Sequence, residues 1–100
     1  AHEMIGLPKE SVLFPNYPNP FNMETTIPYQ IMQEGEYLVA IYNTTGQLVR
    51  TLHSGFIPYG LHKLSWNGLD DQSQPVSSGV YLISLLGKDT RDLRKLMLLK

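Results

Sequence analysis

The stretch that decides the fold is residues 37–52, which read YLVAIYNTTGQLVRTL. Two apolar runs rich in β-branched residues, which favour extended backbone, flank a short polar segment that ends at Gly46. Asn43 and Gly46 both tolerate the positive φ that a tight reversal of the chain needs. The stretch therefore predicts a β-hairpin, and we expect Gly46 to adopt positive φ in its turn.

The first strand of this hairpin is apolar on both faces, so we predict that it lies in the middle of a sheet. On the return strand, Val49 and Leu52 break the strict alternation of apolar and polar residues. We therefore predict a β-bulge near Arg50 and Thr51, which lets both side chains face the core. The first strand is expected to place Tyr37, Val39 and Ile41 on one face and Leu38, Ala40 and Tyr42 on the other.

Outside the hairpin, Gly and Pro interrupt the chain at short intervals, and apolar residues show no sustained helical spacing. Pro28 lies within a predicted strand and indicates an edge strand or a bulge there. Short strands, short turns and no helix predict an all-β fold, an immunoglobulin-like antiparallel β-sandwich of about seven strands, with a small barrel as the alternative. We expect the sandwich to occupy residues 11–100, after a linker or cloning remnant at 1–10. Besides the two hairpin strands, the expected strands are 11–14, 25–31, 61–66, 79–86 and 93–99.

Composition narrows the classes of function. The 100 residues carry a net charge of −1, which argues against non-specific nucleic-acid binding, and no cysteine, which excludes disulfides and thiolate metal sites. No apolar run approaches the ~20 residues that span a membrane, and we find no signal peptide. The charge is uneven, because residues 88–100 carry five basic and two acidic side chains, a net charge of +3. A solvent-exposed strand edge protected by lysine is the simpler explanation of this basic end.

Two places could bind a ligand, and each has a simpler structural explanation. Trp66 could stack on a sugar ring, but its place at the end of an alternating strand predicts a buried core anchor near Ile41, Val49 and Tyr81. Calcium needs six to eight oxygen ligands, so in the polar loop 67–75 we expect instead a turn whose Asn and Asp side chains accept hydrogen bonds from local amides. The oxygen ligands of the ion alternative are Asn67, Asp70, Asp71 and Ser73.

No arrangement of residues indicates catalysis. The three histidines are not spaced as metal ligands, no Ser-His-Asp triad has an obvious context, and no glycine-rich phosphate loop is present. We therefore expect no enzyme activity, no metal site and no cofactor. The histidines are His2, His53 and His62.

Several separated motifs occur in order along the chain. They are NYPNPFN at 16–22, TTIPY at 25–29, IYNTTGQLVRTL at 41–52, GLH at 60–62, WNG at 66–68, SGVY at 78–81 and KLMLLK at 95–100. In this order they resemble the C-terminal sorting domains (type A) of type IX secretion cargo in Gram-negative bacteria, which are related to the immunoglobulin-like domain of flagellar hook-capping proteins. The resemblance runs from Leu13 to Lys100. It departs from the pattern at Met23, where proline is common, and at Ser73, where a turn glycine is usual.

The resemblance implies a seven-stranded immunoglobulin-like sandwich without catalytic activity. Such domains end large secreted proteins and direct them through the type IX secretion system across the outer membrane. The implied partners are the outer-membrane translocon, its shuttle proteins and a sortase-like peptidase that cuts upstream of the sandwich; nucleic acid is not among them. The implied location is the periplasm in transit, and then the cell surface or the medium.

We expect the last strand and its basic residues to carry the sorting signal, because a terminal strand offers backbone pairing and charge to a receptor. The expected recognition residues are Lys95, Leu96, Met97, Leu98, Leu99 and Lys100. The loop 16–22 is expected to be structural, with Phe21 tucked inward. The residues expected to maintain the fold are Asn16, Pro18, Asn19, Pro20, Phe21, Asn22, Gly46, Trp66, Gly68, Gly79 and Tyr81.

Two alternatives remain open at this point. The chain could be an accessory immunoglobulin-like spacer or carbohydrate-binding module of a secreted hydrolase, and sugar binding would need two or more coplanar exposed aromatic rings. It could also be the immunoglobulin-like part of a hook-capping protein, which would need chain beyond Lys100. A homodimer through edge strands is open as well.

Overall fold

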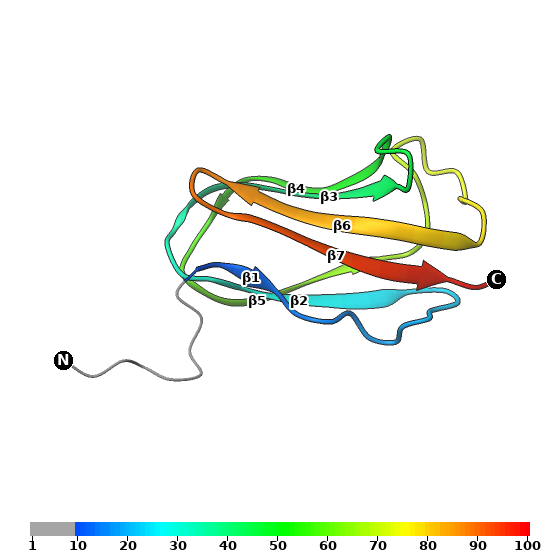
Figure 1. The fold of residues 1–100 in the computed structure, drawn as a ribbon, viewed down its shortest axis with the longest axis horizontal. Coiled ribbons are helices and arrows are strands. Elements are labelled where there is room, and N and C mark those ends of the chain that lie inside the picture. The colour runs from blue at the N-terminus through cyan, green and yellow to red at the C-terminus, as the bar shows by residue number, and fades with distance from the viewer. Residues whose placement is uncertain (1–9) are drawn as a thin grey trace.

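The computed structural model describes residues 10–100, which form seven strands in two antiparallel sheets without a helix (Figure 1). One sheet has the strand order β1-β2-β5 and the other β4-β3-β6-β7. This confirms the predicted immunoglobulin-like β-sandwich. Most of the predicted linker lies outside the described residues, and in the described part no helix could cross a membrane. The strands are β1 (Val12–Leu13), β2 (Thr25–Ile31), β3 (Gly35–Asn43), β4 (Leu48–Ile57), β5 (Gly60–Trp66), β6 (Gly79–Gly87) and β7 (Arg91–Leu98).

The predicted hairpin is β3 and β4, and β3 lies between β4 and β6 as a central strand. Gly46 has a φ of 86°, as expected, and the Asn43 side chain accepts a hydrogen bond from the Gln47 N–H at 2.9 Å. We predicted one bulge, whereas the register between β3 and β4 shifts twice and leaves Val49 and Leu52 as the extra residues of β4. Both side chains pack against the core, as the alternation required.

The prediction for Pro28 was wrong. β2 is the middle strand of its sheet and pairs with β5 without a bulge. The Pro28 carbonyl accepts a hydrogen bond from the Phe14 N–H at 2.9 Å, but Pro28 has no N–H to donate in return. The backbone nitrogen of Pro28 therefore points toward the β1 side, just beyond the end of that two-residue strand. The sheet loses no hydrogen bond between β2 and β5.

The core lies between the sheets, and Trp66 is at one end of it. Its indole is 1% exposed, and its Nε1–H donates to the Leu69 carbonyl at 2.9 Å. Its ring centroid lies 5.2 Å from that of Tyr81, edge to face, and 5.6 Å from that of Phe21. Trp66 is thus the predicted core anchor, in one cluster with Ile41 and against Val49, and it is not available to stack on a sugar.

Candidate recognition surface on the last strand

The last strand, β7, lies at the edge of the four-stranded sheet, and β6 is its neighbour within that sheet. Its alternation divides the predicted recognition residues. Leu96 and Leu98 are 0% and 1% exposed and belong to the core, so the folded domain does not present their side chains. Lys95, Leu99 and Lys100 are exposed and Met97 is half-buried, which leaves four of the six side chains accessible to a partner.

The outward backbone of β7 is already paired near its end. The Met97 N–H donates to Asn19 Oδ1 at 3.0 Å, and the Met97 carbonyl accepts from the Phe21 N–H at 2.9 Å. The Leu99 N–H then donates to the Phe21 carbonyl at 2.8 Å, which makes a short parallel bridge. We expected this edge to be open for strand addition, but the loop 16–22 occupies it.

Side chains cover the other half of the same edge. Asp92 Oδ2 accepts from the Leu13 N–H at 2.8 Å, and Arg94 Nε donates to the Leu13 carbonyl at 3.1 Å. Within residues 10–100, Leu93 and Lys95 are left between these two groups of contacts, and the Leu93 N–H already donates to Asp92 Oδ1 at 2.9 Å, so the open run of backbone is too short for an added strand. A partner that recognises β7 in the folded domain therefore reads its side chains rather than its backbone.

The loop 16–22 is built from the residues that the sequence singled out. The Asn16 side chain is 7% exposed and donates to Thr25 Oγ1 at 2.9 Å, and Thr25 Oγ1 in turn donates to the Pro18 carbonyl at 2.9 Å. Phe21 is 2% exposed, as predicted. Pro18 and Pro20 both follow cis peptide bonds. These contacts fix the loop beneath the end of β7, and Asn22 Nδ2 extends them to the Leu99 carbonyl at 3.2 Å.

The remaining predicted structural residues lie near the same end of the sandwich. Gly68 has a φ of 75°, and a Cβ there would lie 3.5 Å from Leu98 Cδ2, so the turn after β5 closes against the last strand. Gly79 begins β6 in register with Leu98. Tyr81 is buried, and its hydroxyl donates to the Ser77 carbonyl at 2.6 Å.

The loop 67–75 is the predicted hydrogen-bonded turn. Asp70 Oδ1 accepts from the N–H groups of Gln72 and Gln74 at 2.9 and 3.0 Å, and Asn67 Oδ1 accepts from that of Leu69 at 3.2 Å. In the described part of the chain, no three His, Cys, Asp or Glu side chains come together as a metal site. Asp71 Oδ1 instead accepts a hydrogen bond from the Thr51 N–H at 3.0 Å, so this loop covers the edge of β4.

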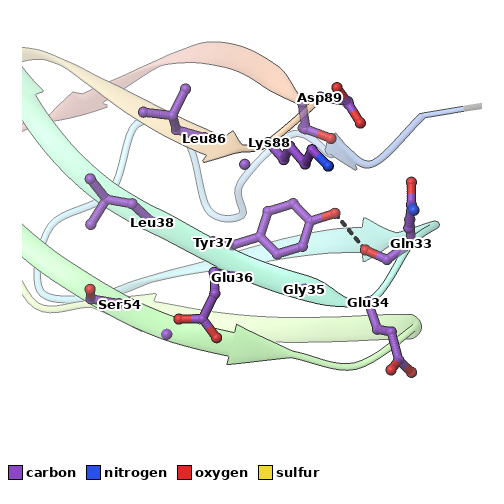
Figure 2. Close-up of a pocket in the computed structure, with 13 residues that line it drawn as sticks. Gln33, Glu34, Gly35, Glu36, Tyr37, Leu38, Ser54, Leu86, Lys88 and Asp89 are labelled. Atoms are coloured by element: carbon purple, nitrogen blue, oxygen red, sulfur yellow. Dashed lines mark hydrogen bonds between the residues drawn. The ribbon is translucent and has the colours of Figure 1, made fainter.

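An open hollow of about 610 Å³ lies at the other end of the sandwich, where β3 begins and β6 ends. Leu38 and Leu86 give it apolar walls, while Glu36 and Lys88 are among its charged residues (Figure 2). The Tyr37 hydroxyl donates to the Gln33 carbonyl at 2.6 Å, and its ring fills the place of a Gly87 side chain, whose Cβ would lie 2.5 Å from it. We did not predict this hollow. Its lining combines these apolar walls with three carboxylates and one lysine.

Two buried polar side chains stand apart from these surfaces. Tyr29 stacks on His62 with 5.3 Å between ring centroids, and burial raises the pKa of its phenol above the ordinary 10.0. Within residues 10–100, His53 Nε2 is buried and has no hydrogen-bond partner. Neither belongs to a metal-ligand cluster of the described chain.

Comparisons with known proteins agree with this fold. The family described as FlgD Ig-like domain matches residues 23–90. A dimeric latent PorU from Porphyromonas gingivalis is similar over 94% of this chain, with 20% identity and a TM-score of 0.66. PorZ, described as an essential bacterial surface component of the type-IX secretion system of Porphyromonas gingivalis, is similar over 86%, with 24% identity and a TM-score of 0.57. The chain spans 10% of that PorU chain and 11% of that PorZ chain, and no curated protein sequence matches it significantly.

Proposed function

The chain belongs to the family of FlgD Ig-like domains, and from this premise we propose that it is a non-catalytic sorting domain. In this proposal the domain directs a larger secreted protein through the type IX secretion system to the cell surface. Two observations support it besides the ordered sequence motifs. The fold is similar to parts of PorU and PorZ, and PorZ is described as a component of that system. The side chains of Lys95, Leu99 and Lys100 are exposed on a strand end whose backbone is held in place.

The observation that carries the proposal is the separation of the two ends of the described chain. Glu10 and Ser11 lie beside Asp89 and Thr90, at the turn between β6 and β7. The Lys100 N–H donates to Ser78 Oγ at 2.9 Å, at the opposite end of β6 (Figure 1). A cargo domain joined upstream would therefore lie far from the C-terminal residues and would leave them accessible. A signal that must be read while attached to its cargo needs this arrangement.

The partners in this proposal follow from the accessible chemistry. Lys95 and Lys100 offer two mobile cations, which suit an acidic surface on the translocon or on a shuttle protein. A sortase-like peptidase would cut upstream of Ser11, where the chain leaves the sandwich. The protein would pass through the periplasm and finish at the cell surface or outside the cell.

A reporter fused upstream of residues 1–100 in a type IX-competent host tests the proposal. Lys95→Ala with Lys100→Ala should leave the reporter in the periplasm, because the two exposed cations of the last strand are gone. The control is Lys63→Ala, which removes a positive charge from an exposed position on the other sheet. Such exposed substitutions change stability by less than about 0.5 kcal/mol, so both variants should melt like the parent.

Two results would count against the proposal in different ways. Normal surface delivery of the folded Lys95 and Lys100 variant would remove the basic end from the mechanism. Normal delivery of a reporter that lacks the whole domain would refute the sorting function itself.

A further inference from the structure

The outward side of the four-stranded sheet is apolar, although no described residue covers it. Cross-strand pairs point to one side of a sheet, and Leu38 pairs with Leu86, as Tyr42 does with Leu82. All four side chains are on the side opposite the core residues Val39 and Ile83. We call this side the outer face; around its central pair of small residues, Ala40 and Ser84, its large apolar side chains include Leu38, Tyr42, Val80, Leu82, Leu86 and Leu93.

The outer face is unusual in the number of large apolar side chains that it exposes. Of the nine large apolar side chains exposed in residues 10–100, four are on the outer face: Leu48, Phe56, Leu86 and Leu93, at 53%, 54%, 44% and 57%. The outward side of the other sheet instead places Thr26 beside Ser65 and Pro28 beside Lys63. Antiparallel sheets with one solvated side usually carry polar residues there, and contiguous exposed apolar patches mark interaction sites. The outer face therefore has the character of an interface.

Positive charge on the outer face lies along one margin. Arg91 and Lys95 both point outward from β7, in register with Leu86 and Leu82. The opposite margin, on β4, carries uncharged side chains such as Ser54 and Phe56, and the exposed carboxylate of Glu36 lies beside Phe56 on β3. A complementary surface is therefore apolar in its middle and acidic along the side that meets β7.

The hollow described above is continuous with this face. Leu38, Ser54 and Leu86 belong to both, so the apolar surface ends in a recess of about 610 Å³ (Figure 2). Interfaces draw much of their affinity from a few large side chains that fill such recesses. A partner with one projecting aromatic or aliphatic residue near the end of its apolar strip would fit the outer face and the hollow together.

We propose that the outer face binds a protein partner that presents an apolar strip with acidic side chains along the margin facing Arg91 and Lys95. The inference rests on the proposed sorting function, and this partner is the receptor of the signal. Lys95 and Met97 are on the outer face as well as at the end of the last strand, so the recognition surface extends from β7 across β6 and β3.

A second copy of this chain fits the outer face less well. Two sheets can pack face to face about a two-fold axis in two ways. One arrangement lays the cationic margin of β7 on itself, which is repulsive. The other lays each margin on β4, where the single carboxylate of Glu36, on the neighbouring strand β3, faces the two cations Arg91 and Lys95. One carboxylate balances only one of the two cations, so charge complementarity favours a partner with more acidic side chains along this margin over self-association.

The test replaces exposed leucines of the outer face by glutamate in the reporter fusion. Leu86→Glu and Leu93→Glu each place a carboxylate on the outer face. The carboxylate would meet the apolar strip of the partner and repel the acidic side chains along its margin. The matched control is Leu61→Glu, which makes the same change at a 73% exposed position on the other sheet. Both outer-face variants should lower the surface fraction of the reporter about tenfold or more, as hot-spot losses do, while Leu61→Glu is delivered normally. Thermal melts of the purified variants should match the parent.

The outcomes of this test distinguish a failure of the inference from a failure of the proposed function. Normal delivery of Leu86→Glu and Leu93→Glu, with the domain still required for delivery, would overturn the inference and leave the proposed function standing. Delivery without the domain would overturn the proposed function instead. A concentration-dependent dimer in light scattering, abolished by Leu93→Glu, would show that a second copy occupies the outer face and would refute the acidic partner.

Discussion

Replacing Phe21 by alanine should separate the anchor of the 16–22 loop from the rest of the core. Phe21 is 2% exposed and its ring contacts that of Trp66, so the whole side chain leaves a buried site. Removal of a buried phenylalanine side chain costs about 3–5 kcal/mol, transfer and cavity included. The total stability of a domain this size is about 5–15 kcal/mol, so the variant should fold but with a large loss.

Urea unfolding followed by circular dichroism measures that loss, and hydrogen exchange locates it. The Leu99 N–H is held by the Phe21 carbonyl, so its exchange should accelerate more than that of the amides in β3, which is paired on both sides. Phe21→Leu is the matched control, because it keeps an apolar group and should cost less than about 1.5 kcal/mol. A loss below about 1 kcal/mol for Phe21→Ala, or equal acceleration at Leu99 and in β3, would refute the anchoring role.

Three further predictions concern single residues. Gly46→Val should destabilise the domain by more than about 1 kcal/mol in thermal melts, because φ is 86° there; Gly46→Asn, which tolerates that φ better, should cost less. Burial raises the pKa of Tyr29, so the folded state holds the phenol proton more tightly than the unfolded chain does. Stability should therefore fall as the pH rises above 10.0, and Tyr29→Phe should lose less than the parent in alkaline urea melts. His53→Leu should raise stability by about 1 kcal/mol, because it removes a buried nitrogen that has no partner in residues 10–100; a loss of that size would mean that the nitrogen is satisfied.

The strands could be predicted because their signals are local in the sequence. The order of the strands in each sheet could not, because it depends on distant segments. β2 and β6 begin at the residues that alternation and flanking Gly or Pro indicated, because these signals are carried within each segment. The Pro28 error came from sheet order, which depends on a strand far along the chain. The number of bulges in β4 was missed for the same reason, since pairing with β3 decides whether Val49 and Leu52 share one irregularity or have one each.

The candidate site shows the same difference between features that depend on local sequence and features that depend on distant residues. Lys95 and Lys100 were predicted from a local cluster of charge, and the structure leaves both exposed. The closed edge of β7 could not be read from sequence, because Asn19 and Phe21 reach Met97 across most of the chain. The apolar outer face had a visible signal, namely apolar residues on both sides of β3. We took that signal to mean a central strand, which β3 is, and did not infer from it that one apolar face of the sheet would stay exposed.

The bridge between Phe21 and the last strand also affects the order in which the domain can fold. β7 is synthesised after every other strand, yet the loop 16–22, β1 and β6 all depend on it for hydrogen bonds. Contacts this distant in sequence form late, because the intervening chain must first be brought together. Until Leu99 has left the ribosome, or has emerged from any pore that the chain threads, the inward side of β6 lacks Leu96 and Leu98 and the domain cannot close. The finished sandwich therefore marks a polypeptide that has been synthesised at least through β7.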